Sequence, residues 1–432
     1  MNRATTSLKR PLKRVEQRTS HAHLLRDVSR SPAPPARSRS GRLDAVIVPA
    51  SRPACFLQPA IDLATSLGVM LVVLCSKQTG AEQVAKRVAN TPRAKCLIIP
   101  VPEGWKHSRF PSRTTDSGFE IANGGRVSDV SAKRNLGLIL ARLHGWNKIA
   151  FVDDDITLSR TDNIARLAGQ LEAHQVAGMV VPRHPDNSVV CHARRLAGLF
   201  QDVFVTGAVL GVHCNSLPLS FFPDIYNEDW FFFAKEAATR SLPRVGKARQ
   251  EEYDPFASPD RARQEEFGDL LAEGLYAWFG EASADMSFEE QLSGATSGYW
   301  DQFIEVRRDV LTETRTVLGR FAGRDPEDDR LASAFYALGA AKSQLDEVGP
   351  DLCVNFLDAW REDLADWQRF SNRINNVGST REAMDFLELK TWTLAEFGAA
   401  SVEPQGGSRR LTSLMGVSNP TPAAARTIPR SG

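Results

Sequence analysis

Apolar and polar residues over residues 43–259 follow one another in a pattern that alternates between strands and helices. Short continuous apolar runs, which are typical of buried strands, occur at residues 44–49, 69–75 and 96–101. Apolar residues at helical spacing lie between these runs, over residues 61–67 and 81–88. A strand–helix–strand order predicts an α/β fold whose parallel strands are joined by right-handed crossovers.

The strongest pattern lies between residues 131 and 156, where a predicted helix precedes a predicted strand. Four apolar residues recur at helical spacing and form one stripe: Leu136, Ile139, Leu140 and Leu143. Gly145 follows them, at a place where glycine commonly ends a helix. The apolar run at residues 149–152 then predicts a buried strand, which stops at three consecutive aspartates.

These aspartates, Asp153, Asp154 and Asp155, stand where the strand is expected to leave the sheet. Adjacent carboxylates repel one another and cannot be buried without partners. Ligands of α/β sheets bind at the carboxyl ends of strands, and a divalent cation would neutralise carboxylates placed there. Acidic residues also cap helices or lie in solvated turns, so the triplet alone leaves both interpretations open.

Two cations, Lys133 and Arg134, lie at the start of the helix that precedes this strand. The helix dipole favours anions at that end, so cations there need an anionic partner. A bound diphosphate would supply one, and a solvated basic turn is the alternative.

The periodicity becomes helical from about residue 260. Apolar stripes that are typical of packed helices begin at Phe267, Trp300, Leu331 and Leu352. Disordered tails are predicted at both ends, which are rich in Arg, Ser, Pro or Gly. The predicted organisation is a basic tail, an α/β domain, a helical region and a second tail, at residues 1–42, 43–259, 260–401 and 402–432.

The charge is distributed unevenly along the 432 residues, although the formal net charge is only +1. The first 42 residues hold 11 Lys or Arg and 2 acidic residues, and the rest of the chain is mildly acidic. An acidic folded part gives no sign of a nucleic-acid-binding surface. The apolar runs are too short to span a bilayer, and the basic N-terminus lacks the apolar stretch of a secretory signal.

The six cysteines are scattered and include no CxxC pair or zinc-binding spacing. Several lie in apolar, strand-like runs, which suits reduced and buried thiols. We therefore expect a soluble cytoplasmic protein.

The Arg134-Asn135 pair, the strand that ends in aspartates and a later Glu228-Asp229 pair occur in the order found in one enzyme family. In this respect the chain resembles the family-2-like glycosyltransferases of the GT-A fold, loosely over residues 43–240. The resemblance implies a Rossmann-like, mixed and mostly parallel sheet flanked by helices. It also implies that the protein transfers a sugar from a nucleoside-diphosphate sugar to an acceptor hydroxyl, with inversion.

The resemblance further assigns roles to individual residues. Asp153 and Asp155 would bind Mn²⁺ or Mg²⁺. Asp229 would be the general base, with Glu228 as the second candidate, because a sugar hydroxyl is a poor nucleophile until a carboxylate removes its proton. The donor would be bound by residues of three segments: Pro49, Ser51, Arg52, Lys133, Arg134, Asn135, Asp153 and Asp154.

The sequence departs from the family pattern in three ways. Residues 76–79 contain no acidic residue, although many members use one there to bind the base of the donor. All eight histidines lie at or before His213, so a metal-binding histidine after the Glu-Asp pair is missing. The QxxRW element of processive membrane synthases is also absent.

Two other interpretations stay open. A nucleotidyltransferase can share the sheet and the metal-binding aspartates, but residues 48–60 lack the glycine-rich basic loop of those enzymes. A non-catalytic binding protein could use the same fold, although two intact acidic motifs disfavour it. The sugar, the base of the donor, the acceptor and the oligomeric state are not determined by the sequence.

Overall fold

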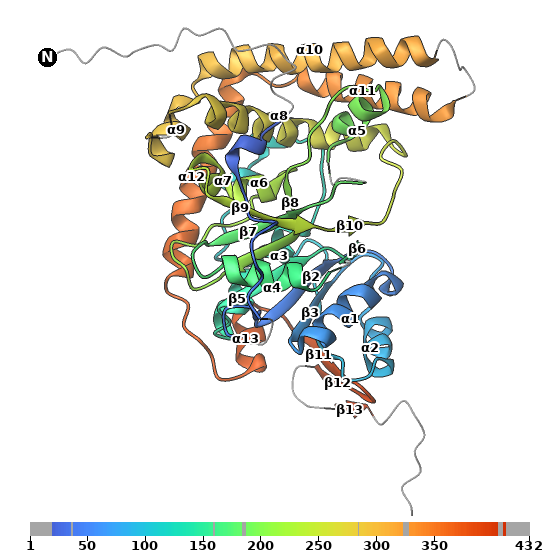
Figure 1. The fold of residues 1–432 in the computed structure, drawn as a ribbon, viewed down its shortest axis with the longest axis vertical. Helices are drawn as coiled ribbons and strands as arrows, with labels where there is room; N and C mark the ends of the chain where they lie inside the picture. The colour runs from blue at the N-terminus through green and yellow to red at the C-terminus, as the bar shows by residue number, and fades with distance from the viewer. Residues whose placement is uncertain are drawn as a thin grey trace, which may run out of the picture.

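The computed structural model describes residues 20–35, 38–158, 160–183, 187–283, 285–322, 328–404 and 409–411. Its centre is an 11-stranded sheet with the strand order β1-β9-β7-β8-β5-β2-β3-β4-β11-β12-β13 (Figure 1). The strands of this sheet are β1 (Leu25–Asp27), β2 (Ala45–Ala50), β3 (Met70–Cys75), β4 (Lys95–Pro100), β5 (Lys148–Val152), β7 (Val176–Val180), β8 (Val205–His213), β9 (Leu242–Lys247), β11 (Thr391–Glu396), β12 (Ala399–Pro404) and β13 (Arg409–Leu411). A separate two-stranded sheet pairs β6 (Ile156–Thr157) with β10 (Arg249–Gln250).

The sheet is mixed, and its central part is parallel. Strands β5, β2, β3 and β4 are parallel neighbours, and their continuous apolar sequences fit burial on both faces. Strand β8 runs antiparallel between β5 and β7, and β11 runs antiparallel beside β4. The predicted α/β class with a mixed, mostly parallel sheet flanked by helices is therefore confirmed.

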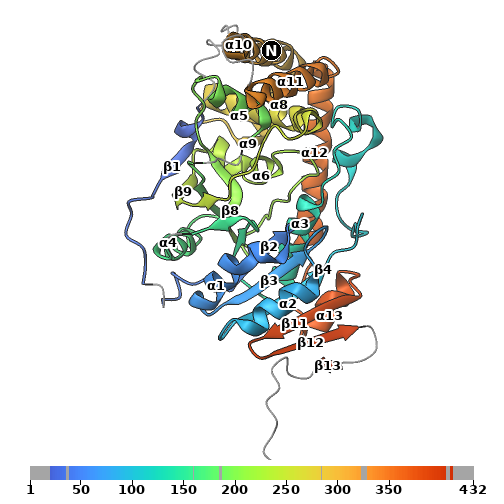
Figure 2. The same cartoon turned by 90° about the vertical axis from the view of Figure 1, so that its right-hand side faces the viewer.

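Helices cover both faces of the sheet (Figures 1 and 2). Alternate residues of β2 illustrate this, because Val46 packs with the core under α1, α2 and α4, whereas Ile47 packs with the core that contains α3 and α8. The first group of helices comprises α1 (Gln58–Leu67), α2 (Ala81–Asn90) and α4 (Asp162–Gln170). The second face carries α3 (Val130–Leu143), α5 (Val189–Leu196), α6 (Glu228–Phe232) and α7 (Ala234–Ala238), together with the helices that follow residue 258.

The predicted helical region packs on the same core as the sheet. Its helices are α8 (Pro259–Glu281), α9 (Phe288–Gly294), α10 (Ser297–Ala322), α11 (Asp329–Leu345), α12 (Pro350–Ser371) and α13 (Thr380–Phe386). Aromatic side chains join the two parts, as where Phe231 of α6 contacts Trp360 of α12 with ring centroids 5.1 Å apart. Figure 2 shows α12 as a long helix that runs from the α10–α11 layer toward the sheet.

Several segments differ from the sequence prediction. Residues 25–27, expected in the basic tail, form β1 and pair in parallel with β9, because backbone pairing needs no apolar pattern. Residues 391–404, expected partly in the helical region and partly in the second tail, form β11 and β12. Helix α5 begins at Val189, and the Ser188 hydroxyl caps it by accepting from the Cys191 N–H at 3.2 Å.

The remaining short elements are 3₁₀ helices: η2 (Ala22–Leu24), η3 (Ala54–Leu57), η4 (Arg113–Thr115) and η5 (Ser117–Phe119). The outermost parts of both predicted tails, residues 1–19 and 412–432, lie outside the described residues. Among the helices of the described residues, none has the length and apolar character needed to cross a bilayer.

Candidate functional site

The candidate site is organised around the guanidinium of Arg134, which α3 places beside the carboxyl end of β5. Its Nη2 donates to both carboxylate oxygens of Asp153, at 2.9 and 3.2 Å. Its Nη1 donates to Oε1 of Glu228 at the start of α6. The two carboxylates are 19 and 94 residues away in the sequence. One buried arginine therefore joins the two acidic motifs that the sequence analysis singled out.

The space for this guanidinium depends on a glycine in β8. A Cβ atom at Gly207 would lie 2.5 Å from Nη1 of Arg134, closer than packed atoms approach. The guanidinium also lies over the ring of Phe222, with 5.6 Å between Cζ and the ring centroid. Burial alone would lower the pKa of Arg134, but Asp153, Glu228 and Asp229 outweigh it and raise the pKa, so the side chain is a permanent cation.

Asp229 lies next to this cluster and is held by backbone groups. Its Oδ2 accepts from the N–H of Gly207 at 2.5 Å, and its Oδ1 accepts from the N–H of Trp230 at 2.9 Å. Burial, followed by the charge of Glu228, raises the pKa of Asp229 to about 7, although Arg134 acts in the opposite direction. A carboxylate with a pKa near neutrality is suited to take up and release a proton.

Asp154 turns away from Arg134 and binds the loop that follows β2. Its Oδ2 accepts from the N–H groups of Ser51 and Arg52 at 2.7 and 2.8 Å. Its Oδ1 accepts from Nη1 of Arg52 at 2.5 Å. The carboxylate of Asp154 therefore fixes the conformation of this loop. Its bonds also hold Ser51 and Arg52, two predicted donor-binding residues, next to the acidic turn.

The negative charge of Asp155 is partly compensated by protein partners. Its Oδ2 pairs with Nη2 of Arg52 at 2.8 Å and accepts from Nε2 of Gln250 at 3.1 Å. Its Oδ1 is buried and has no hydrogen-bond partner within the part of the chain that the structure describes. Burial raises the pKa of Asp155 to about 6, with the charge of Asp153 acting in the same direction.

The carboxylates at this strand end fit a hard divalent cation. Such cations prefer oxygen ligands, and the orphaned Oδ1 of Asp155 and the partly exposed carboxylate of Asp153 offer them. Burial raises the pKa of Asp153 as well, and a cation beside these groups would favour their ionised forms. Among the described residues these aspartates do not form a group of three mutually close ligand atoms.

The ammonium group of Lys133 binds groups of the protein itself. Its ammonium group donates to the carbonyl of Ala50 at 2.8 Å and to Oγ of Ser76 at 2.6 Å, and it pairs with Asp129 at 3.2 Å. Burial lowers the pKa of Lys133, although Asp129 opposes this. An ammonium group has three N–H donors and all three find partners here, so Lys133 ties α3 to the ends of β2 and β3.

Two further candidates also have structural partners. Asn135 exchanges two hydrogen bonds of 2.8 Å with the backbone of Phe222, which anchors the segment that leads to Glu228. Pro49 lies within β2 opposite Leu74 and is buried there, so it is not part of the following loop. The structure thus separates the candidates into those that surround Arg134 and those that support the surrounding backbone.

A cavity opens beside Arg134, and Asp153 of the aspartate turn and the Glu228-Asp229 pair line it. It is lined by Arg126, Val130, Arg134, Asp153, Tyr226, Asn227, Glu228, Asp229 and Trp230. Sequence reasoning did not assign roles to Arg126 or Tyr226. Tyr226 could have been found from the aromatic residues around the Glu-Asp pair. Nothing in the polar segment at residues 102–128 marks Arg126, which reaches the cavity while paired with Asp224 at 3.0 Å.

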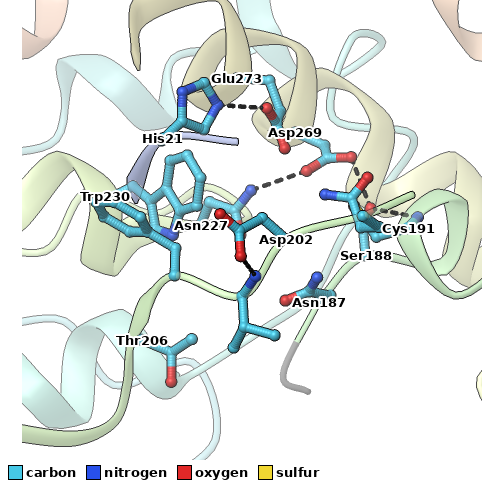
Figure 3. A pocket seen from close by; sticks show the side chains of 13 residues that line it. His21, Asn187, Ser188, Cys191, Asp202, Thr206, Asn227, Trp230, Asp269 and Glu273 are labelled. Carbon is cyan, nitrogen blue, oxygen red and sulfur yellow. Dashed lines mark hydrogen bonds and ion pairs between the residues drawn. The ribbon is translucent and has the colours of Figure 1, made fainter. Parts of the chain in front are cut away.

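A second, smaller pocket adjoins the first at Asn227 and Trp230 (Figure 3). Among the described residues, one group of three potential metal ligands lies here, with its ligand atoms within 4.8 Å of one another: Cys191, Asp269 and Glu273. The two carboxylates already have protein partners, since Asp269 pairs with Arg307 at 2.6 Å and Glu273 with His21 at 2.8 Å.

Comparison of the sequence with protein-family models and with curated proteins gives no match. A solved structure that is similar to this chain is the mannosyltransferase PcManGT from Pyrobaculum calidifontis, in complex with GDP-Man and Mn²⁺. The identity is 15%, the TM-score is 0.40, and the match covers 73% of this chain and 90% of that chain. This similarity is too low to transfer an activity, so the chemistry of the site carries the functional assignment.

Proposed function

We propose that this protein is a metal-dependent glycosyltransferase of the GT-A type, which moves a sugar from a nucleoside-diphosphate sugar to an acceptor hydroxyl with inversion. The observation that carries the proposal is the meeting of two acidic motifs at Arg134. One lies at the carboxyl end of a buried strand, where α/β sheets bind ligands, and the other contains a carboxylate whose pKa is about 7.

The proposed reaction is a single displacement. The oxygen of the acceptor hydroxyl forms a bond to the anomeric carbon while Asp229 takes up the hydroxyl proton. The bond between that carbon and the diphosphate oxygen breaks, and its electron pair leaves with the diphosphate. Glu228 is the second candidate for the base, but its carboxylate is paired with Arg134, which leaves it less available.

The other residues act on the donor. A Mn²⁺ or Mg²⁺ ion bound by Asp153 and Asp155 would neutralise the charge that develops on the leaving diphosphate. Arg52 is 38% exposed in its side chain and lies at the same end of the sheet, so it is suited to contact the diphosphate with Ser51. Asp154 keeps that loop in place, and Arg134 holds Asp153 and Glu228 at a fixed separation.

A panel of sugar nucleotides tests the proposal. We expect one of UDP-glucose, UDP-N-acetylglucosamine or GDP-mannose to raise the melting temperature in the presence of Mn²⁺. A donor at 100 times its Kd should stabilise the fold by about 2.7 kcal/mol. Mn²⁺ alone and donor with a chelator are the controls, and the absence of any donor-dependent shift across an extended panel would contradict the proposal.

A further inference from the structure

Helix α8 contacts the segment 226–230 on both sides of the Glu228-Asp229 pair. Before the pair, Nδ2 of Asn227 donates to Oδ1 of Asp269 at 3.1 Å, a contact drawn in Figure 3. After the pair, the hydroxyl of Tyr276 donates to the carbonyl of Trp230 at 2.7 Å. Both contacts come from one helix, so the two acidic residues lie between two fixed points.

The first contact fixes an unusual backbone conformation. Asn227 has a φ of +61° and a ψ of +35°, in the left-handed region that few residues other than Gly, Asn and Asp adopt. It occupies the position before the first turn of α6, yet its side chain makes no capping bond there. The side chain binds Asp269 instead, so α8 determines the direction in which α6 begins.

A second, independent observation is the close approach of the two backbones. A Cβ atom at Gly268 would lie 2.3 Å from the carbonyl oxygen of Tyr226 and 2.8 Å from its carbonyl carbon. Only glycine fits at this position, because the neighbouring atoms belong to backbone and cannot rotate away. The helix therefore packs directly on the residues that precede the acidic pair.

Asp269 is itself held by the rest of the helical region. Arg307 of α10 donates from Nε and Nη2 to the two oxygens of Glu266 at 2.8 Å each, and from Nη2 to Oδ2 of Asp269 at 2.6 Å. The hydroxyl of Ser188 donates to the same Oδ2 at 2.6 Å. Arg307, Glu266 and Asp269 are all buried, so this network has little freedom to rearrange.

From these contacts we infer that α8, locked by Arg307, positions Glu228 and Asp229, with Gly268 and Asp269 as positioning residues. The inference rests on the proposed function of the acidic pair. It gives the helical region a role in the reaction, because a displacement of about 1 Å at a reacting group can cost a hundredfold in rate.

The first test compares two Gly→Ala variants in helices. Gly268→Ala should push the Tyr226 backbone away, whereas a Cβ at Gly319 in α10 would meet Phe335 at an ordinary 3.6 Å, so Gly319→Ala is the matched control. Hydrogen exchange of amides 227–233 and the Mn²⁺-dependent hydrolysis of UDP-glucose and GDP-mannose are measured for both. We expect at least about tenfold lower kcat, little change in KM and faster exchange in Gly268→Ala alone.

The second test is a swap within the hydrogen-bonded pair. Asn227→Asp keeps a residue that tolerates the left-handed region but places two carboxylates against each other, so exchange should quicken and kcat should fall. Adding Asp269→Asn restores a hydrogen-bond donor at position 269 opposite an acceptor at position 227. This double variant should regain at least half of the lost kcat. Failure of the double variant to recover both exchange and kcat would contradict the inference.

The two proposals fail separately. If both probes are inert with the wild-type protein while amides 227–233 respond as expected, the positioning holds and the transferase proposal falls for these donors. If hydrolysis proceeds and neither exchange nor kcat changes in Gly268→Ala or Asn227→Asp, the transferase proposal stands and the positioning by α8 is wrong.

Discussion

The aspartate turn at residues 153–155 and the Glu228-Asp229 pair are both acidic and both close to Arg134, but their charges are compensated differently. Each aspartate of the turn has an arginine within 2.9 Å, namely Arg134 for Asp153 and Arg52 for the other two. Among the described residues, Asp229 accepts from two backbone N–H groups, and the arginine nearby is bound to its neighbour Glu228.

Because of this difference, we expect the aspartates of the turn to stay ionised and Asp229 to gain or lose a proton. A guanidinium remains charged at every physiological pH and favours the ionised form of a carboxylate bound to it. Backbone N–H groups do so more weakly. Burial raises the pKa of Asp153, Asp155 and Asp229 alike, and at Asp229 the charge of Glu228 raises it further, to about 7. The turn is thus suited to hold a cation, and Asp229 to exchange a proton.

The largest expected effect follows from replacing Asp229. Asp229→Asn keeps the shape and removes the proton acceptor, so turnover should fall by about 10²–10⁴-fold while donor affinity stays near wild type. The check is kcat for transfer together with Kd for the donor. Glu228→Gln is the matched control and should cost less, and loss of donor binding in Asp229→Asn would move this residue to the metal site.

Removing the shared arginine should come next in size. Arg134→Met leaves Asp153 and Glu228 without their buried cation, and we expect the free energy of unfolding to fall by about 3–5 kcal/mol. Denaturant unfolding measures this. Arg160→Met breaks an exposed pair with Asp162 and should change stability by less than about 1 kcal/mol, and equal effects of the two substitutions would refute the central role of Arg134.

Neighbouring aspartates of the turn should respond differently to substitution. Asp155→Ala should lower donor affinity at least about tenfold in Mn²⁺, because it removes a buried oxygen suited to bind the ion. The fold should survive, because Arg52 loses its contact with Asp155 but keeps Asp154 as a partner. Asp154→Ala should mainly lower the melting temperature, since it removes three hydrogen bonds to the loop after β2. Calorimetry with and without Mn²⁺ separates the two, and unchanged Mn²⁺-dependent binding in Asp155→Ala would exclude this residue as a ligand.

The smallest effect concerns pH. A general base works when deprotonated, so the rate should be low in acid and rise as the pH passes through about 7, the pKa of Asp229. Glu228→Gln removes a charge that raises this pKa, so the rising part of the profile should move to lower pH. A pH–rate profile of both proteins is the measurement, and an unshifted profile would mean that another group titrates.

The central sheet was predictable because its strands are continuous apolar runs separated by amphipathic helices. Strands β2, β3, β4 and β5 were expected within one or two residues of their observed bounds. Strand β1 was not, because its sequence, Leu-Arg-Asp, has no apolar pattern and is recruited through backbone bonds to β9. Strand β11 was taken for a continuation of helices, since its partner β4 lies far away in the sequence.

For the site, the sequence indicated which residue types matter but not what each side chain binds. Arg134 and Lys133 are adjacent and both basic, yet one joins two acidic motifs and the other ties together backbone segments. Adjacent positions on a helix point in directions about 100° apart, so their partners depend on the packing of other elements. Gly268 and Asp269 could not have been found, because their importance comes from contacts across 42 residues.

The two ends of the large sheet have a consequence for how the protein behaves in concentrated solution. Strands β1 and β13, at the two edges, are only three residues long and offer few free backbone groups to another chain. Strand β9, directly inside β1, is six residues long. A protein shortened to begin after residue 27 would present β9 as an open edge. We expect such a protein to aggregate through strand pairing. Strand β1 therefore also protects the protein against self-association.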